Sequence, residues 1–232
     1  MEHSTATYRP VNSKHGGQRD RQCDTGTVYV PRAFAIEDLT VIHEVIRQNS
    51  FAMLVTNGPG GMEATHLPVV LETDGESPGS LHAHVARANR QWEAFDGERE
   101  AMFVFAGQHG YISPSWYEAG PAVPTWDYVA VHAYGRPKII EDETRVLAIL
   151  DALVSQYEGA MERPWTLETQ DREWLRKLSG GIVAFETEIT RIDAKAKLGQ
   201  NRPADQARVA AALEELGARE LAALIRNAAG QP

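Results

Sequence analysis

Apolar side chains alternate with polar ones along several short stretches of the chain. This is the pattern of β-strands that bury one face. The stretches are FAMLVT, MEATHLPVVLE, SLHAHV, AMFVFAG and GIVAFETEITRI. The turn-forming segments NGPGG and DGESPGS separate the first three of them. Strands that follow one another through short turns predict a β-barrel rather than a sheet with helical crossovers.

A further strand-like stretch, VPTWDYVAVHAYG from Val123 to Gly135, carries an acidic residue in an unexpected place. If the stretch alternates, Asp127 shares the more apolar face with Val129 and Val131, while Trp126 lies on the other face. Burying a carboxylate alone is costly, so Asp127 must find a partner, face water or bind a ligand. It is either a strand-end carboxylate that accepts backbone N–H groups or a ligand-binding residue.

Helical periodicity is found in fewer segments. We expect a short helix from about Asp38, a helix in ARANRQWEAF, a long one in ETRVLAILDALVSQYEG and another from about Leu167 to Leu178. Two more helical segments lie between Ala204 and Ala229 and are separated at Gly217. The segments GYISPSWYE and AKAKLGQNRP are predicted as loops. The fold class is therefore α+β, a β-barrel with peripheral helices.

The first 27 residues contain few apolar side chains and show no periodicity, which is typical of a flexible leader. We therefore divide the chain into a leader at residues 1–27, a barrel domain at 28–203 and C-terminal helices at 204–232.

Composition narrows the classes of function. The 232 residues carry a net charge of −9 and have a pI near 5.4, which disfavours nonspecific binding to nucleic acid. The chain lacks an apolar run long enough to span a bilayer and a hydrophobic signal-peptide core, so we expect a cytoplasmic protein with no membrane partner. Cys23 is the only cysteine, so an intrachain disulfide is excluded.

Glycine-rich phosphate loops, HExxH, GxSxG and CxxC motifs are all missing from the sequence. Histidine, arginine, lysine and amide side chains instead gather in four short segments. These are ATHLP with His66, LHAHVARANRQW with His84, Arg87 and Asn89, GQHGYISPSWY with His109, and AKAKLGQNRP with Lys197 and Gln200. Each has an ordinary structural explanation, because a histidine on a half-buried strand is more often a packed or surface residue than a ligand.

The order of several motifs resembles that of the PaiB family from Val28 to about Leu213. The motifs are ATHLPVVL, HAHVARANRQW, YISPSWYE, VPTWDYVAVHAYG and GIVAFETEITRIDAKAKLGQNRP. The resemblance implies an FMN-binding-type split β-barrel and a homodimer with cofactor sites at the subunit interface. Members of the family are described as FMN-binding negative transcriptional regulators. By position, Ala52 to Thr56 would lie along a flavin ring, His66 near its edge, and Arg87 with Asn89 at the phosphate.

Four positions depart from the family's usual motifs. The chain has Asp127 where PTWNY has asparagine, and Gly199 where KLSQN has serine. It also has Gln108 in place of proline in GPH or GPD, and Arg90 in place of proline in ANPQW. At position 127 a neutral amide is replaced by an anion that only accepts hydrogen bonds. These departures predict a pocket that holds a different ligand.

The PaiB-like group also includes haem-dependent piperazate synthases, which form an N–N bond by cyclising δ-N-hydroxyornithine. Membership of that branch would imply haem b with a histidine as the axial ligand of its iron. The candidate metal ligands are His66 and His84, with His109 third. Asp127 and Trp126 are the candidate catalytic residues, because an amine must lose a proton before it attacks. The further cofactor-binding candidates are Thr56, Arg87, Asn89, Lys197 and Gln200.

Two functions from different classes are therefore expected. The first is a haem-dependent cyclase that acts on a small amino acid derivative. The alternative is a dimeric, FMN-binding negative transcriptional regulator, the only case in which DNA would be a partner. A flavin-dependent oxidoreductase is permitted by the fold, but none of the residues specifically supports it.

Overall fold

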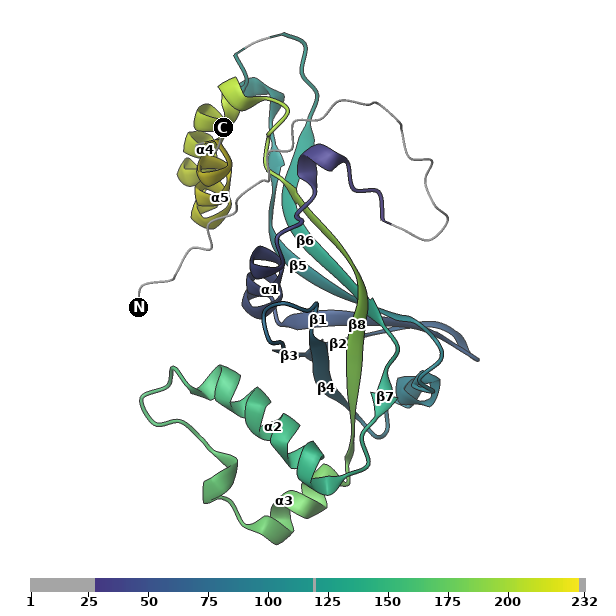
Figure 1. Ribbon diagram of the computed structural model, residues 1–232. Helices are drawn as coiled ribbons and strands as arrows, with labels where there is room; N and C mark the ends of the chain where they lie inside the picture. The colour runs from purple at the N-terminus through teal and green to yellow at the C-terminus, as the bar shows by residue number, and fades with distance from the viewer. Residues whose placement is uncertain (1–27, 119, 230–232) are drawn as a thin grey trace. The chain divides into compact units, whose positions relative to one another are not determined.

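A computed structural model describes residues 28–118 and 120–229 of the chain (Figure 1). Its strands are β1 (Phe51–Gly58), β2 (Gly61–Pro68), β3 (Val70–Glu72), β4 (Ser80–Ala86), β5 (Ala101–Ile112), β6 (Thr125–Gly135), β7 (Lys138–Ile139) and β8 (Ile182–Lys197). Its helices are α1 (Leu39–Gln48), α2 (Glu143–Glu158), α3 (Arg172–Ser179), α4 (Gln206–Glu215) and α5 (Arg219–Ala229). Short 3-10 turns include η2 (Arg90–Ala94) and η3 (Pro114–Trp116). The leader predicted at residues 1–27 lies outside the described residues.

The strands pair in the order β2-β1-β5-β6-β8-β4-β3, and β7 also pairs with β8. The pairs β1 with β2, β1 with β5, β3 with β4, and β4 with β8 are all antiparallel. In the register of β4 and β8, His82 lies opposite Glu186 and His84 opposite Ala184. Residues opposite each other share a sheet face, so this register fixes which side chains are neighbours.

The described residues form two compact units, and β5, β6 and β8 contribute residues to both. Unit 1 contains residues 28–45, 106–131 and 193–229, and unit 2 contains residues 46–105 and 132–192. In unit 1, α4 packs against α5, and their buried side chains include Leu213, Leu221 and Ile225. In unit 2, an apolar cluster of Ile140, Ile149, Leu153 and Ala184 joins α2 to the sheet.

The alternation predicted for Val123–Gly135 is confirmed in β6. Asp127, Val129, Val131 and Ala133 are buried on one face, whereas Trp126 is 54 % exposed on the other. The hairpin of β1 and β2, the long helix α2 and the break between α4 and α5 also follow the sequence pattern. The side chains of β1 that face inward, Ala52, Leu54 and Thr56, recur at every second residue.

The loop predictions for two segments are wrong in part, because β5 and β8 extend into these segments. β8 continues to Lys197, so Lys195 and Lys197 lie on a strand whose buried positions are Ala194 and Ala196. β5 continues through Gly110 to Ile112. A Cβ atom at Gly110 would lie 2.7 Å from Leu221 Cδ2, so the glycine permits the close approach of α5.

Two predicted helices are shorter in the structure than the sequence indicated. In ARANRQWEAF only Arg90–Ala94 is helical, as a 3-10 turn, because Asn89 accepts a hydrogen bond from the Gln91 N–H and caps it. The helix expected at 167–178 is divided at Asp171, which caps α3 by accepting from the Trp174 N–H. In both cases a short polar side chain begins a new helical segment at its N-cap.

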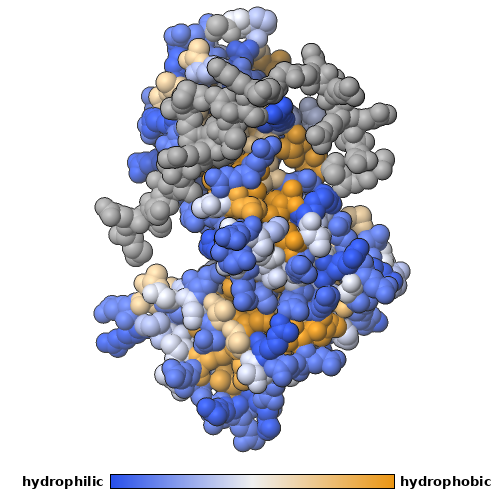
Figure 2. Space-filling view, viewed as in Figure 1, coloured by the Kyte–Doolittle hydropathy of each residue, from blue (hydrophilic) through white to orange (hydrophobic). Residues whose placement is uncertain are grey.

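Hydrophobic residues also reach the surface over α2 and α3, as Figure 2 shows in the lower part of the view. None of the residues in α3 is buried. Within the part of the chain that the structure describes, none of the helices is long and apolar enough to cross a membrane.

Candidate functional site

The predicted site residues divide into two sets, one in each compact unit. Unit 1 contains the β6–β8 cluster, which we define as Thr125, Trp126, Asp127, Lys197 and Gln200. His109 belongs to the same unit. Unit 2 contains Thr56, His66, His84, Arg87 and Asn89. Each set of residues therefore belongs to a single unit.

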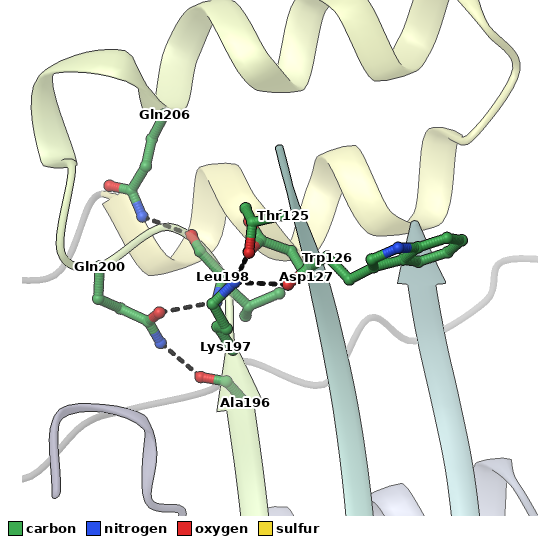
Figure 3. Close-up of polar contacts among 8 residues, drawn as sticks. All are labelled: Thr125, Trp126, Asp127, Ala196, Lys197, Leu198, Gln200 and Gln206. Carbon is green, nitrogen blue, oxygen red and sulfur yellow. Dashed lines mark hydrogen bonds and ion pairs between the residues drawn. The ribbon is translucent and has the colours of Figure 1, made fainter. Parts of the chain in front are cut away.

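Asp127 finds its partner in Lys197. Only 3 % of Asp127 is exposed, and its Oδ1 lies 3.4 Å from Lys197 Nζ (Figure 3). The same ammonium donates to Thr125 Oγ1 at 2.5 Å and to the Trp126 carbonyl at 2.6 Å. The buried carboxylate is thus held by a cation that is itself anchored to the start of β6. Pairing with a cation reduces the cost of burying the charge.

Burial and the ion pair act on Asp127 in opposite directions. Removal from water raises the pKa of this carboxyl, whereas the charge and hydrogen bond of Lys197 lower it. Burial is the larger effect, so the pKa lies above its ordinary value. A carboxylate with a raised pKa is a better proton acceptor than an exposed one.

The turn after β8 is held by two amide side chains. Gln200 accepts from the Leu198 N–H at 2.7 Å and donates to the Ala196 carbonyl at 2.6 Å, while Gln206 donates to the Leu198 carbonyl at 2.8 Å (Figure 3). Both polar atoms of the Gln200 amide are therefore used within the turn. This bonding fits a residue that shapes the turn, although each amide atom can still make a second hydrogen bond.

Two of the four departures from the family motifs are neighbours in space. Gly199 has φ +76°, and a Cβ atom there would lie 3.6 Å from Asp127 Oδ2. The other two departures have different partners. Gln108 donates to Glu220 Oε2 at 2.5 Å, and Arg90 forms an exposed ion pair with Glu93 at 2.8 Å.

A small cavity of about 10 Å³ adjoins Asp127, which is of the order of one water molecule. Gly199, Gln206, Tyr117, Arg202 and Asp205 are among the residues that line it. Burial raises the pKa of Tyr117, and the negative charge of Asp127 raises it further. The cavity is too small for an organic ligand in the conformation described.

Trp126 is exposed beside two other aromatic rings. Its ring centroid lies 6.3 Å from that of His109 and 6.2 Å from that of Tyr111. His109 Nδ1 is 3.1 Å from the Gly107 carbonyl. The structure therefore brings His109 to Trp126, which the sequence did not predict.

In unit 2, Thr56 and Asn89 are linked through Gln91, a residue that the sequence prediction left out. Gln91 is only 1 % exposed, and its Nε2 donates to Thr56 Oγ1 at 3.0 Å and to the carbonyls of Leu54 and Glu63. Asn89 donates to Thr65 Oγ1 at 2.9 Å and accepts from the Gln91 N–H. These groups form a hydrogen-bonded cluster between β1, β2 and η2, so most of their hydrogen bonds are used in the fold. Gln91 Oε1 is buried without a hydrogen-bond partner among the described residues.

Arg87 is anchored without a carboxylate. Its Nε donates to the Gly180 carbonyl at 2.9 Å and its Nη2 to the Ile182 carbonyl at 2.8 Å. Neither bond uses Nη1, and Arg87 lines a cavity of about 420 Å³ in unit 2. An arginine that is held in this way can present its remaining N–H groups to an anion.

The two candidate metal ligands differ in environment. His66 is exposed on β2, with its ring stacked on Phe51 at a centroid distance of 6.0 Å. His84 is half-buried on β4, its Nδ1 is buried without a hydrogen-bond partner, and burial lowers the pKa of the imidazole. The neighbouring His82 also has a buried Nδ1 without a hydrogen-bond partner, and its Nε2 lies 3.1 Å from Glu72 Oε2. Among the described residues, there is no group of three or more His, Cys, Asp or Glu side chains that could hold a metal ion.

Residues 28–191 match the family model described as "Putative FMN-binding domain". The chain is 33 % identical over 175 residues to the protease synthase and sporulation protein PAI 2 of Bacillus subtilis. The matched region covers 75 % of this chain and 83 % of that protein. It is 37 % identical over 103 residues to the uncharacterized protein YKL070W of Saccharomyces cerevisiae. That match covers 42 % of this chain and 61 % of the yeast protein.

Among solved structures, the "putative 5-nitroimidazole antibiotic resistance protein" of Bacteroides thetaiotaomicron matches with a TM-score of 0.53 and 14 % identity, over 69 % of this chain and 85 % of that one. The "conserved hypothetical protein Rv2991" of Mycobacterium tuberculosis matches with a TM-score of 0.52 and 12 % identity, over 73 % and 91 %. Identities this low concern the fold alone. The predicted fold class, α+β of the FMN-binding split-barrel type, is confirmed.

Proposed function

Since this chain belongs to the PaiB-like family of FMN-binding-domain proteins, we propose that it is a cofactor-dependent enzyme that binds haem b through His84. The reaction we propose is intramolecular N–N bond formation of the piperazate synthase type, with δ-N-hydroxyornithine as substrate. The observation that carries the cofactor assignment is the imidazole of His84, which is half-buried and has a ring nitrogen without a partner.

The surroundings of His84 suit an axial ligand. Iron binds an unprotonated imidazole nitrogen, and burial keeps the pKa of His84 low, so that the ring is neutral at pH 7. Opposite His84 on β8 lies Ala184, which belongs to the apolar cluster with Ile140 and Ile149. An apolar neighbourhood lowers the local dielectric and limits the access of water to a bound iron.

When bound, haem would supply a Lewis-acidic iron that polarises the N–O bond of a hydroxylamine. The amine nitrogen of the substrate then joins the hydroxylamine nitrogen, and the hydroxyl leaves as water. This exchange is redox-balanced within the substrate, so no external oxidant is consumed. The amine must be unprotonated to attack, which requires a proton acceptor.

Within unit 1, Asp127 is the group best suited to accept the proton, and we propose it for this role, with Trp126 before it on the exposed face of β6. Because the cavity beside Asp127 holds about one water molecule, the proton would reach the carboxylate through water. Burial raises the pKa of Asp127, which favours acceptance of a proton. Lys197 lies against Oδ1, whereas Oδ2 is on the side of Gly199 and the small cavity. Lys197 already supplies a positive charge here, so Asp127 is more suited to proton transfer than to permanent pairing with a substrate ammonium.

A second candidate function, an FMN-binding negative transcriptional regulator, is favoured by Arg87. Its guanidinium is anchored by two carbonyls and has no carboxylate partner among the described residues, which suits a phosphate group. The homodimer predicted from the sequence belongs to both candidates and remains a proposal.

The absorption spectrum of the protein separates the two functions. The protein would be purified from cells supplied with 5-aminolevulinate and riboflavin, and we expect a Soret band that His84→Ala abolishes and His66→Ala retains. Loss of the band in His66→Ala alone would move the ligand to His66. The paired absorption bands of a flavin without a Soret band would overturn the haem proposal and favour the regulator.

Turnover tests the reaction separately. We expect the haem-loaded protein to convert δ-N-hydroxyornithine to the cyclic product, as measured by mass spectrometry, and Asp127→Asn to abolish conversion while keeping the Soret band. Trp126→Phe is the companion variant on the exposed face of the strand. A haem-loaded protein that leaves this substrate unchanged would overturn the N–N assignment alone.

A further inference from the structure

We propose that unit 2 contains a binding site for a small zwitterion, a molecule with a carboxylate, an ammonium group and an apolar body, such as an aliphatic amino acid. The site is the cavity of about 420 Å³ that Arg87 lines, which we call the β4–α3 cleft. Its volume falls in the range of small-molecule sites in proteins. The inference uses neither His84 nor Asp127, so it does not rest on the proposed reaction.

The apolar part of the cleft comes from a tryptophan and the edge of the sheet. The residues are Trp92, Ile140, Val146, Ile182 and Ala184. The indole N–H of Trp92 donates to the Arg87 carbonyl at 3.0 Å, so the ring is held in place with its polar atom occupied. A fixed ring beside aliphatic side chains suits the apolar body of a ligand.

Two arginines supply positive charge. Arg87 is held by the carbonyls of Gly180 and Ile182, which leaves Nη1 available. Arg176 lies in the last turn of α3, and its side chain makes no hydrogen bond or ion pair with the described residues. Two guanidinium groups beside one cavity suit a carboxylate, which accepts two parallel N–H bonds from a single guanidinium.

Two glutamates supply negative charge to the same cleft. Glu141 precedes α2 and Glu143 is its first residue, and both line the cavity. Within the described part of the chain, neither forms an ion pair, with the two arginines or with any other residue. The nearby Arg145 shows the contrast, since its guanidinium pairs with Glu186 at 2.5 Å.

Helix dipoles explain only half of this arrangement. An acid at the start of α2 and a base at the end of α3 are each favoured by the dipole of the helix, which accounts for Glu143 and Arg176. Arg87 and Glu141 lie outside both helices. Arg87 is placed there by its bonds to the Gly180 and Ile182 carbonyls, and Glu141 lies just before Asp142, the N-cap of α2. They bring one more charge of each sign to the cleft, where a ligand that carries both charges would meet both.

Selectivity follows from the balance of the four charges. A ligand with only a carboxylate would meet the arginines but leave the two glutamates beside an apolar or negative group. A ligand with only an ammonium would meet the opposite mismatch. A zwitterion satisfies both pairs, so each singly charged analogue should bind more weakly.

Isothermal titration calorimetry of the full chain tests this with three probes. L-Leucine has both charges, 4-methylpentanoate lacks the ammonium, and 3-methylbutylamine lacks the carboxylate. We expect L-leucine to bind at concentrations up to about 10 mM and each analogue to bind at least about tenfold more weakly. Absence of L-leucine binding, or equal binding of the three probes, would overturn the proposal.

Variants assign the two ends of the ligand. Arg176→Gln should weaken L-leucine and 4-methylpentanoate by about tenfold and leave 3-methylbutylamine unchanged, and Glu141→Gln should show the reverse pattern. Lys177→Gln is the matched control, because Lys177 lies in the same last turn of α3 but does not line the cleft. Glu173→Gln is the corresponding acidic control. Equal effects of a variant on all three probes would indicate a structural role and overturn the assignment.

The same titration on protein loaded with haem or FMN separates this proposal from the function proposed above. Arg87 is the phosphate candidate under the FMN function, and Ala184 lies opposite the proposed haem ligand His84, so a bound cofactor would reach the lining of the cleft. We therefore expect L-leucine to bind the cofactor-free protein, and each cofactor to lower its affinity. L-leucine binding that requires a bound cofactor would overturn the zwitterion site. Failure to bind either cofactor would count against the proposed function and leave the titration result valid.

Discussion

The side chain of Asp127 is buried, pairs with Lys197 and lies next to Gly199. Lys197 is anchored to the Thr125 hydroxyl and the Trp126 carbonyl, so the ammonium that faces Asp127 is held by the two residues before it. The sequence predicted that this carboxylate needs a partner, but not which one. Lys197 is distant in sequence, and only the pairing of long strands brings the two charges together.

Removing Lys197 should leave a buried carboxylate without a counter-charge. We expect Lys197→Met to lower the free energy of unfolding by about 3 kcal/mol at neutral pH. The double variant Asp127→Asn/Lys197→Met should recover most of that loss, because no charge is then buried. Urea denaturation of the wild type, both variants and the exposed control Lys177→Met would measure this. An unchanged stability in Lys197→Met would show that the pair contributes nothing.

The raised pKa of Asp127 predicts a specific dependence on pH. Because the folded pKa lies above the unfolded value near 3.8, the folded state binds this proton more tightly. The stability that Asp127 contributes is greatest below pH 3.8 and is lost as the pH rises through the folded pKa. We therefore expect Asp127→Asn to gain stability relative to the wild type over that window, as measured by denaturation at a series of pH values. A relative loss over the same window would mean that Lys197 outweighs burial.

At the scale of elements, short capping residues decide where helical structure begins. Asn89 ends the turn after β4 and starts η2, and Asp171 starts α3. The apolar spacing in the sequence predicts helices across both positions, whereas the side chains of Asn89 and Asp171 cap new segments there. The sequence prediction also missed the end of β8, where alanines and lysines alternate as regularly as larger residues do elsewhere. Alternation of small residues is a weak signal in sequence, since alanine also favours helices.

Asn89 should matter more than its half-exposed position indicates. Asn89→Ala removes the cap of η2 and the bond to Thr65, so we expect the free energy of unfolding to fall by about 1–2 kcal/mol. Asn57→Ala, at an exposed position of β1, is the control and should change little. Thermal and urea denaturation would check the difference. If Asn89→Ala lowered the free energy of unfolding no more than the control does, the hydrogen-bonded cluster around Gln91 would not depend on this cap.

At the scale of the whole molecule, most strands and the family were within reach of the sequence, whereas the order of the strands and the partners of the polar groups were not. Alternation identified most strands, and the motifs identified the PaiB-like family. Gln91 was not among the predicted site residues, because its role depends on three acceptors from separate segments. Cavities and unpaired charges, such as those of Arg176 and Glu141, exist only in three dimensions.

Continuous strands should make unfolding cooperative. β5, β6 and β8 each contribute residues to both compact units, so neither unit can lose its strands without affecting the chain of the other. We expect one transition with coincident midpoints in far-UV circular dichroism, tryptophan fluorescence and calorimetry. Two separated transitions would show that the units unfold independently despite the shared strands.

The left-handed backbone at Gly199 has an evolutionary consequence. Because a Cβ atom there would lie 3.6 Å from Asp127 Oδ2 and 3.4 Å from Gln206 Cγ, a hydroxyl side chain at position 199 would adjoin whatever occupies position 127. The effect of a substitution at either position would then depend on the residue at the other. In descendants of this gene, exchanges at 127 and 199 are expected to co-vary, with one replacement altering which residues the other can accept.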